Sequence, residues 1–294
     1  MKVGLQIYTV RNSFAKDPMG TLEEIAKAGY TAIEMANHNA YEDVGTGAGI
    51  PLKEFKAKVD SLGIKVVGAH ILPGDAAKNL DPFYRDFDHF QRIIDFYAEL
   101  GSTNLSIPID FFPTKDYLLK RCEYYNRIGE MCAKSGIYFL YHNHYNEFQR
   151  LNGEYMMDLL VENTDPKYMG VELDAYWMIR GAFDPAEKIR QYGNRVALLH
   201  EKDFPLSQVN NLNAWNVIDQ DTPCDWETFH TATKPEYFTE IGDGMIKVQD
   251  VIDAGNEFKI PYIFVEQDFT TLTEIESINR SMYNFRKMRG LEWN

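Results

Sequence analysis

The sequence has few cysteines and lacks long apolar runs. Its three cysteines, Cys122, Cys132 and Cys224, are odd in number and widely spaced along 294 residues. This pattern excludes a disulfide framework and does not match a zinc ribbon, so a reducing compartment is expected. No apolar segment approaches the roughly 20 residues that span a bilayer. The chain also starts without the apolar stretch of a secretion signal. We therefore expect a cytoplasmic protein with no membrane partner.

Basic residues are also scarce. The chain has 30 Lys and Arg residues against 44 Asp and Glu residues, which gives a formal net charge of −14. Proteins that bind nucleic acids need a basic face that displaces counterions from phosphates. The charge therefore argues against a nucleic-acid partner. Hydrophobic residues make up 45% and charged residues 25%, which is the balance of an ordinary globular protein.

A glycine-rich phosphate loop is missing after the first predicted strand, residues 3–8. The next five residues, 9–13, read Thr-Val-Arg-Asn-Ser and contain no glycine. A doubly wound sheet that binds nucleotides would place its glycine-rich turn at this point. The sequence therefore favours another α/β architecture.

Short β-rich runs alternate with longer amphipathic segments along the whole chain. Strands are predicted at residues 3–8, 32–35, 64–70, 104–107, 137–141, 169–173, 196–199 and 262–265. Helices are predicted at residues 18–28, 51–62, 82–100, 115–135, 154–162, 184–192, 246–258 and 273–288. Alternation of this kind implies parallel strands with helical crossovers. Eight such units predict an α/β fold, a (β/α)8 TIM barrel that forms a single domain over residues 1–294. A long insertion, about 203–238, would lie between strand seven and helix seven.

Polar residues follow the predicted strands, where a barrel carries its active site. His142 and His144 are two residues apart and so share a face, as do Glu172 and Asp174. The last two strands end in further polar residues, namely His200, Lys202 and Glu266. Imidazole and carboxylate groups together suit Mn, Co or Zn, whereas carboxylates alone would favour Mg. The set predicts a divalent metal site at the barrel mouth.

Several stretches resemble the xylose isomerase-like TIM barrels known as sugar phosphate isomerases/epimerases, which share the fold of the AP endonuclease family 2. The matching stretches are residues 4–11, 141–144 with 147–148, 170–177, 199–203, 238–244 and 265–268. The resemblance covers essentially the whole chain. It implies a sugar-modifying enzyme with a divalent metal cation.

The resemblance also implies a ligand set of a Glu, an Asp, a His and a second Glu. Asp174, His200 and Glu266 match the last three, and His142 stands where the first Glu is expected. We therefore predict the metal ligands His142, Asp174, His200 and Glu266, for Mn, Co, Zn or Mg. Whether His142, His144 or Glu172 completes the shell stays open. Epimerases of this kind use both carboxylates as bases, so this departure leaves isomerase, epimerase and lyase open.

The predicted chemistry is removal of a proton next to the carbonyl of a sugar or keto-sugar, with an enediolate stabilised by the metal. Glu266 and His144 are the candidate bases. Lys202 would hold a substrate oxygen or the developing oxyanion, and its alternative is a salt bridge to Asp174 or Glu172. Candidate substrate-binding residues are Tyr8, Glu34, His70, Glu172 and Trp177.

Two other functions are compatible with the same fold. A sugar-binding barrel without catalysis would explain the missing first Glu. A phosphodiesterase of the AP-endonuclease type would need a DNA-binding surface, which the net charge disfavours. The expected partner is a small sugar, and a homo-oligomer stays open because soluble enzymes are commonly symmetric oligomers.

Overall fold

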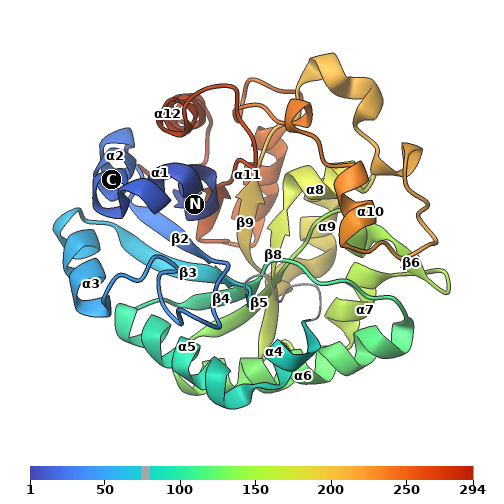
Figure 1. Ribbon diagram of the computed structural model, residues 1–294. Helices are drawn as coiled ribbons and strands as arrows, with labels where there is room; N and C mark the ends of the chain where they lie inside the picture. The colour runs from blue at the N-terminus through green and yellow to red at the C-terminus, as the bar shows by residue number, and fades with distance from the viewer. Residues whose placement is uncertain (74–79, 294) are drawn as a thin grey trace.

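The computed structural model describes residues 1–73 and 80–293. Eight parallel strands close into a barrel (Figure 1) in the order β1-β10-β9-β8-β5-β4-β3-β2. The strands are β1 (Lys2–Gln6), β2 (Ala32–Asn37), β3 (Lys65–Ile71), β4 (Asn104–Ile107), β5 (Tyr138–His142), β8 (Met169–Asp174), β9 (Val196–Glu201) and β10 (Tyr262–Val265). The predicted (β/α)8 TIM barrel is confirmed.

Helices surround the barrel on all sides in Figure 1. They are α1 (Arg11–Lys16), α2 (Pro18–Ala28), α3 (Leu52–Ser61), α4 (Asp81–Arg85), α5 (Phe87–Leu100), α6 (Lys115–Lys134), α7 (Met156–Glu162), α8 (Ala175–Arg180), α9 (Pro185–Tyr192), α11 (Val248–Glu257) and α12 (Glu274–Phe285). Their apolar faces and the outer faces of the strands form one large buried cluster. A smaller cluster fills the inside of the barrel with Ala32, Val67, Leu140, Leu198 and Phe264. The barrel is therefore a packed core whose polar residues gather at one end.

The turns between helices and strands follow the sequence pattern. The residues after α2 and α5 are Gly29 and Gly101, with φ angles of 102° and 88°. This left-handed backbone is strained for residues with a Cβ atom, so glycine is the favoured residue there. The three cysteines are buried and free. No helix in the described part of the chain combines the length and the apolar composition needed to cross a bilayer.

Several predicted boundaries are wrong, and local hydrogen bonds explain three of them. Residues 7 and 8 belong to a 3₁₀-helix, η1 (Ile7–Val10), because the Gln6 side chain accepts from the Tyr8 N–H. The predicted helix 82–100 is two helices, because the Asp86 side chain accepts from the His89 N–H and starts α5. Glu154 and Tyr155 pair as β7 with β6 (Arg150–Leu151) in a small hairpin instead of starting a helix.

The segment after Asp174 lies between the predicted strand 169–173 and the predicted helix 184–192, and it forms helix α8. The Asp174 side chain accepts from the Trp177 N–H at 2.9 Å and caps this helix. Asp174 is therefore both the last residue of β8 and the cap of α8. Trp177 is consequently part of the packed fold and does not belong to a surface loop.

The connection between β9 and α11 is the long segment of the fold. It contains the 3₁₀-helices η5 (Leu206–Asn211), η6 (Ala214–Asn216) and η7 (Pro235–Tyr237) and one short helix, α10 (Trp226–Thr231), drawn in orange in Figure 1. Its two ends meet at Asp203, whose carboxylate accepts from the N–H groups of Phe204, Gly242, Gly244 and Ile246 at 2.8–3.0 Å. A Cβ atom on residue 244 would overlap this carboxylate, so the turn requires glycine.

Candidate active site

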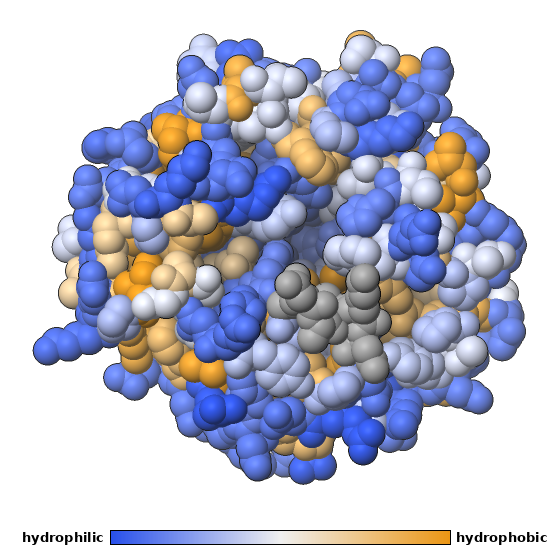
Figure 2. All heavy atoms as spheres, in the orientation of Figure 1, coloured by the Kyte–Doolittle hydropathy of each residue, from blue (hydrophilic) through white to orange (hydrophobic). Residues whose placement is uncertain are grey.

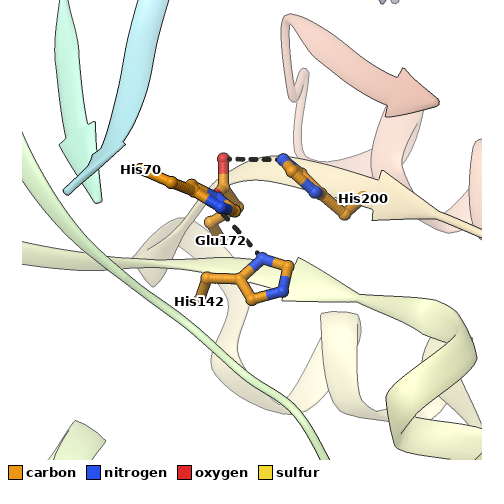
Figure 3. A group of neighbouring side chains, drawn as sticks. All are labelled: His70, His142, Glu172 and His200. Atoms are coloured by element: carbon orange, nitrogen blue, oxygen red, sulfur yellow. Dashed lines mark hydrogen bonds and ion pairs between the residues drawn. The ribbon is translucent and has the colours of Figure 1, made fainter. Parts of the chain in front are cut away.

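Three histidines meet at the carboxyl ends of the strands. His70 on β3, His142 on β5 and His200 on β9 have ring centroids 4.7–5.0 Å apart. The register of the sheet brings them together, because His142 pairs with Glu172 and Asp174 pairs with His200 across neighbouring parallel strands. Figure 3 shows the three rings around the Glu172 side chain.

Glu172 contacts all three rings. Its Oε2 lies 2.7 Å from His70 Nε2 and 3.5 Å from His142 Nδ1, and its Oε1 lies 3.2 Å from His200 Nε2. Glu34 on β2 approaches from the other side, with its Oε2 2.8 Å from His200 Nε2 and 3.2 Å from His70 Nε2. All five side chains are buried. Charged and polar groups at this depth are costly unless they pair or bind a cation.

Lys202 joins a separate set of carboxylates. Its ammonium donates to Asp174 Oδ2 at 2.6 Å and to Glu266 Oε2, and it lies 3.8 Å from Asp268 Oδ1. Only 1% of the lysine side chain is exposed. The salt bridge to Asp174, one of the alternatives expected from the sequence, is therefore present. Glu172 is not an ion-pair partner of Lys202 among the described residues.

The charges of the site follow from burial and from these contacts. Burial opposes ionisation of Glu266, but the charges of Lys202 and His200 outweigh it and hold the pKa of Glu266 well below its usual range. Burial lowers the pKa of His142 to about 3 and holds the pKa of His144 well below its usual range. Both imidazoles are therefore neutral, and a neutral imidazole nitrogen can bind a cation. Burial raises the pKa of Asp268 to about 7, with the charge of Glu266 adding to this effect and that of Lys202 opposing it.

The residues at this end of the barrel fit a divalent cation. The four ligands predicted from the sequence have donor atoms within 4.8 Å of one another, namely His142, Asp174, His200 and Glu266. A second group with the same spacing consists of His70, His142, Glu172 and His200. Both ring nitrogens of His142 are buried and accept or donate no hydrogen bond among the described residues. Mixed imidazole and carboxylate donors suit cations such as zinc, manganese or cobalt.

A cavity of about 850 Å³ opens above the cluster, within the range of small-molecule sites. Figure 2 shows the corresponding hollow near the centre of this face. Tyr8, His70, His144, Glu266 and Asp268 line it with polar groups. Apolar rings from the long connection, Trp226 and Phe229, also line it. The cavity therefore combines polar groups with aromatic rings.

The structure divides the candidate substrate residues into two sets. Tyr8 and His70 line the cavity, whereas Glu34 and Glu172 are buried below it. Trp177 is buried in α8, with its ring 5.0 Å from that of His144 and 5.5 Å from Lys202 Nζ. Of the described residues, those that line the cavity do not include Trp177 or Lys202.

Some cavity residues were not assigned to the site from the sequence. Asp268 stands two residues after Glu266 and shares its side of the strand end, so the same alternation could have identified it. His38 follows β2 as the other histidines follow their strands, and it lines the cavity. Trp226 and Phe229 gave no comparable signal, because the placement of the long connection over the barrel is a tertiary property.

Comparisons with known proteins agree with this architecture. A family model described as xylose isomerase-like TIM barrel matches residues 22–267. The crystal structure of a sugar phosphate isomerase/epimerase from Parabacteroides distasonis is 28% identical, has a TM-score of 0.78 and covers 99% of this chain and 95% of that chain. The structure of the IolI protein, which holds a zinc atom, is 14% identical with a TM-score of 0.69 over 98% of this chain and 97% of that one, and so shows a shared fold.

Relatives found by sequence have a more specific name, but they match a shorter region of the chain. An inosose dehydratase from Geobacillus thermodenitrificans is 27% identical over 129 residues, which are 44% of this chain and 39% of that protein. The chain thus spans 35–45% of the length of three inosose dehydratases that it matches. The family model, in contrast, covers most of the chain. The chain therefore belongs to the xylose isomerase-like TIM barrel family.

Proposed function

We propose that this protein is a metal-dependent enzyme that removes the proton next to the carbonyl of a keto-sugar or a related cyclic polyol ketone. The observation that carries this proposal is the position of Glu266 and His144, which line one cavity directly beside the buried histidine and carboxylate cluster. Two proton acceptors beside a cation site are the components that this reaction requires.

Glu266 is the first candidate base. Its pKa is held well below its usual range, so it is ionised at neutral pH, and Lys202 fixes its Oε2. His144 is the second candidate, because it lines the same cavity and its buried Nδ1 has no hydrogen bond among the described residues. Lys202 is buried beneath Glu266 and does not line the cavity, so we assign it the role of a positioning residue for Glu266 and Asp174.

The cation would be held by His142 and His200, which belong to both candidate groups, together with carboxylates of the cluster. When bound, a divalent cation supplies positive charge that stabilises the substrate oxygen as the neighbouring proton leaves. The zinc atom in the IolI protein supports a cation of this class. Manganese, cobalt and magnesium stay open.

The reaction that follows proton removal is an isomerisation, an epimerisation or a dehydration. The inosose dehydratases among the relatives favour dehydration. So does the pair of Glu266 and Asp268, because their pKa values are pushed apart and both carboxyls line the cavity. An ionised Glu266 can take the carbon-bound proton while a protonated Asp268 gives its proton to the departing hydroxyl, which leaves as water. A carbon–carbon double bond conjugated to the carbonyl remains.

Proton exchange in deuterated water tests the proposal. The protein, reconstituted with zinc or manganese, would be incubated with inososes and keto-sugars, and proton NMR would follow the signal next to the carbonyl. We expect Glu266→Gln or His144→Asn to slow exchange by about 100-fold or more. We expect Asp268→Asn to retain exchange but to lose less water. The exposed Glu257→Gln is the matched control.

Two results would contradict the proposal. Unchanged exchange in both base variants would exclude these residues as the proton acceptors. Sugar binding without any exchange by the wild-type protein would instead support the sugar-binding barrel, in which the missing first Glu marks lost catalysis.

A further inference from the structure

The two candidate cation groups are not equivalent, although they share His142 and His200. One is completed by Asp174 and Glu266, as the family resemblance implies. The other is completed by His70 and Glu172. Within each group the donor atoms lie within 4.8 Å of one another. Because the two groups have two ligands in common, we treat them as alternative positions for one cation.

The group with Asp174 and Glu266 already contains a cation of the protein itself. The Lys202 ammonium binds Asp174 Oδ2 and Glu266 Oε2, the same oxygens that lie 4.0 Å from His142 Nε2. A divalent ion at this position would have to face or displace a buried ammonium. Repulsion between like charges is strong at such distances inside a protein.

No lysine ammonium is paired with His70 or Glu172 in the described part of the chain. Among the described residues, every ion-pair partner of Glu172 is a histidine. Both ring nitrogens of His142 are buried without a hydrogen bond in the described part of the chain, and Nδ1 is the one that faces Glu172. Glu172 Oε1 is also buried without a hydrogen bond there. Buried polar atoms of this kind normally have a partner, and an ion is one of the partners that would satisfy them.

We propose that the cation of this protein is held by His70, His142, Glu172 and His200, and that Lys202 takes the place of the cation between Asp174 and Glu266. The inference rests on the metal dependence of the proposed function and gives it a ligand set. Three imidazoles and one carboxylate match a borderline cation such as Zn²⁺ or Co²⁺ and disfavour Mg²⁺, which prefers oxygen ligands.

The arrangement also accounts for the histidine at the position of the family's first Glu. His142 lies nearer to Glu172, at 3.5 Å, than to Asp174 or Glu266, at 4.0 Å each. Its ring is packed against those of both His70 and His200 (Figure 3). The cation is thereby moved toward β3, and Glu266 is left at the cavity as a base that is not a metal ligand.

X-ray absorption at the zinc edge tests the inference on the wild-type protein, loaded with Zn²⁺ alone. Multiple scattering from imidazole counts histidine ligands, and we expect three. Two histidines with two or more carboxylates would overturn the inference and leave the proposed function intact. Zinc that does not bind at all would overturn both.

Zinc affinity in matched variants gives a second, independent measurement. By competition with a chelating dye, we expect His70→Asn and Glu172→Gln each to weaken Zn²⁺ binding by more than about 100-fold, beyond the usual effect of losing a partner outside the ligand shell. Asp174→Asn and Glu266→Gln should change affinity by less than about 10-fold. The reverse ranking would overturn the inference. Far-UV circular dichroism without zinc identifies any variant that fails to fold.

Discussion

Three consecutive charged residues at the end of β9, Glu201, Lys202 and Asp203, are all buried, but they differ in the partners that compensate their charges. Lys202 faces the barrel and is neutralised by carboxylates of β8 and β10. Asp203 faces the long connection, where four backbone N–H groups bind its carboxylate. Glu201 points away from the barrel interior, and neither of its oxygens has a hydrogen bond among the described residues.

Buried charges that stabilise the fold and buried charges that belong to the candidate site differ in their partners. The Asp203 carboxylate accepts four backbone hydrogen bonds and organises a turn, so we assign it a structural role. The barrel mouth holds charges whose partners are other titratable side chains, and several of its buried donor atoms have no hydrogen bond among the described residues. Perturbed, incompletely satisfied groups of this kind are typical of functional sites.

The largest effect on the free energy of unfolding is expected from removing the ammonium of Lys202. Lys202→Met leaves Asp174 and Glu266 buried without their cation, so the free energy of unfolding of the metal-free protein should fall by about 3–5 kcal/mol. Urea unfolding measures this loss. The exposed pair of Arg190 and Glu257 provides the control, and Arg190→Ala should cost about 1 kcal/mol or less. Equal losses in the two variants would refute the distinction.

The second largest effect is expected from Asp203, which binds the two ends of the connection between β9 and α11. Asp203→Ala leaves four backbone N–H groups without their acceptor, and we expect a loss of about 3 kcal/mol in the free energy of unfolding. Asp243→Ala, in the same turn, removes a partly exposed pair with Arg280 and a hydrogen bond from Asn284, and it should cost about 1 kcal/mol. Limited proteolysis should then cut the connection in the Asp203 variant first. An intact connection would show that Asp203 does not hold it.

Glu201 should behave in the opposite way. Burial, with the charges of Asp203 and Asp174, raises the pKa of Glu201 well above its usual range, so the folded protein holds a proton there that the unfolded chain releases above about pH 4.5. The contribution of Glu201 to the free energy of unfolding therefore becomes less favourable as pH rises above about 4.5. Glu201→Gln should stabilise the protein at pH 8 by about 1–3 kcal/mol and have little effect at pH 4. A pH-independent change in the unfolding midpoint would contradict this.

The smallest effect is expected at His38, a histidine of the cavity wall. Burial lowers its pKa to about 4, so the folded state keeps it neutral while the unfolded chain binds a proton below about pH 6.5. Its contribution to stability is complete above pH 6.5 and is lost as pH falls toward 4. His38→Asn should therefore reduce the loss of stability between pH 7 and pH 5 by about 1 kcal/mol, allowing for partial exposure. Parallel curves for wild type and variant would exclude this titration.

Much of this site is predictable from the sequence, because a barrel collects the residues that follow its strands. The positions of His142, Asp174, His200 and Glu266 at four strand ends were enough to predict that they meet, and their donor atoms do lie together. Helix boundaries were less accurate, since side-chain caps such as that of Asp86 decide them locally.

The sequence did not reveal which charges pair. The contact of Glu34 with His200 joins residues 166 positions apart, and the proximity of His70 to Glu172 depends on how the barrel closes. The choice of Lys202 between Asp174 and Glu172 was equally open, because both carboxylates lie on the same face of β8. Such pairings depend on the curvature of the sheet and on distances that periodicity does not encode.

The meeting of both ends of the long connection at Asp203 has a further consequence for the shape of the cavity. Besides its four side-chain bonds, Asp203 pairs through its backbone with Thr239, so the connection leaves and rejoins the barrel at one point. The residues between these two positions form a loop with fixed ends, and they supply Trp226 and Phe229 to the cavity wall. The connection is also held between its ends, because Arg180 donates to the carbonyls of Leu212 and Ala232 and Tyr145 donates to that of Phe229. A grafted sequence that keeps the two anchors and these three carbonyl contacts would reshape the cavity rim while the barrel and its buried histidines keep their places.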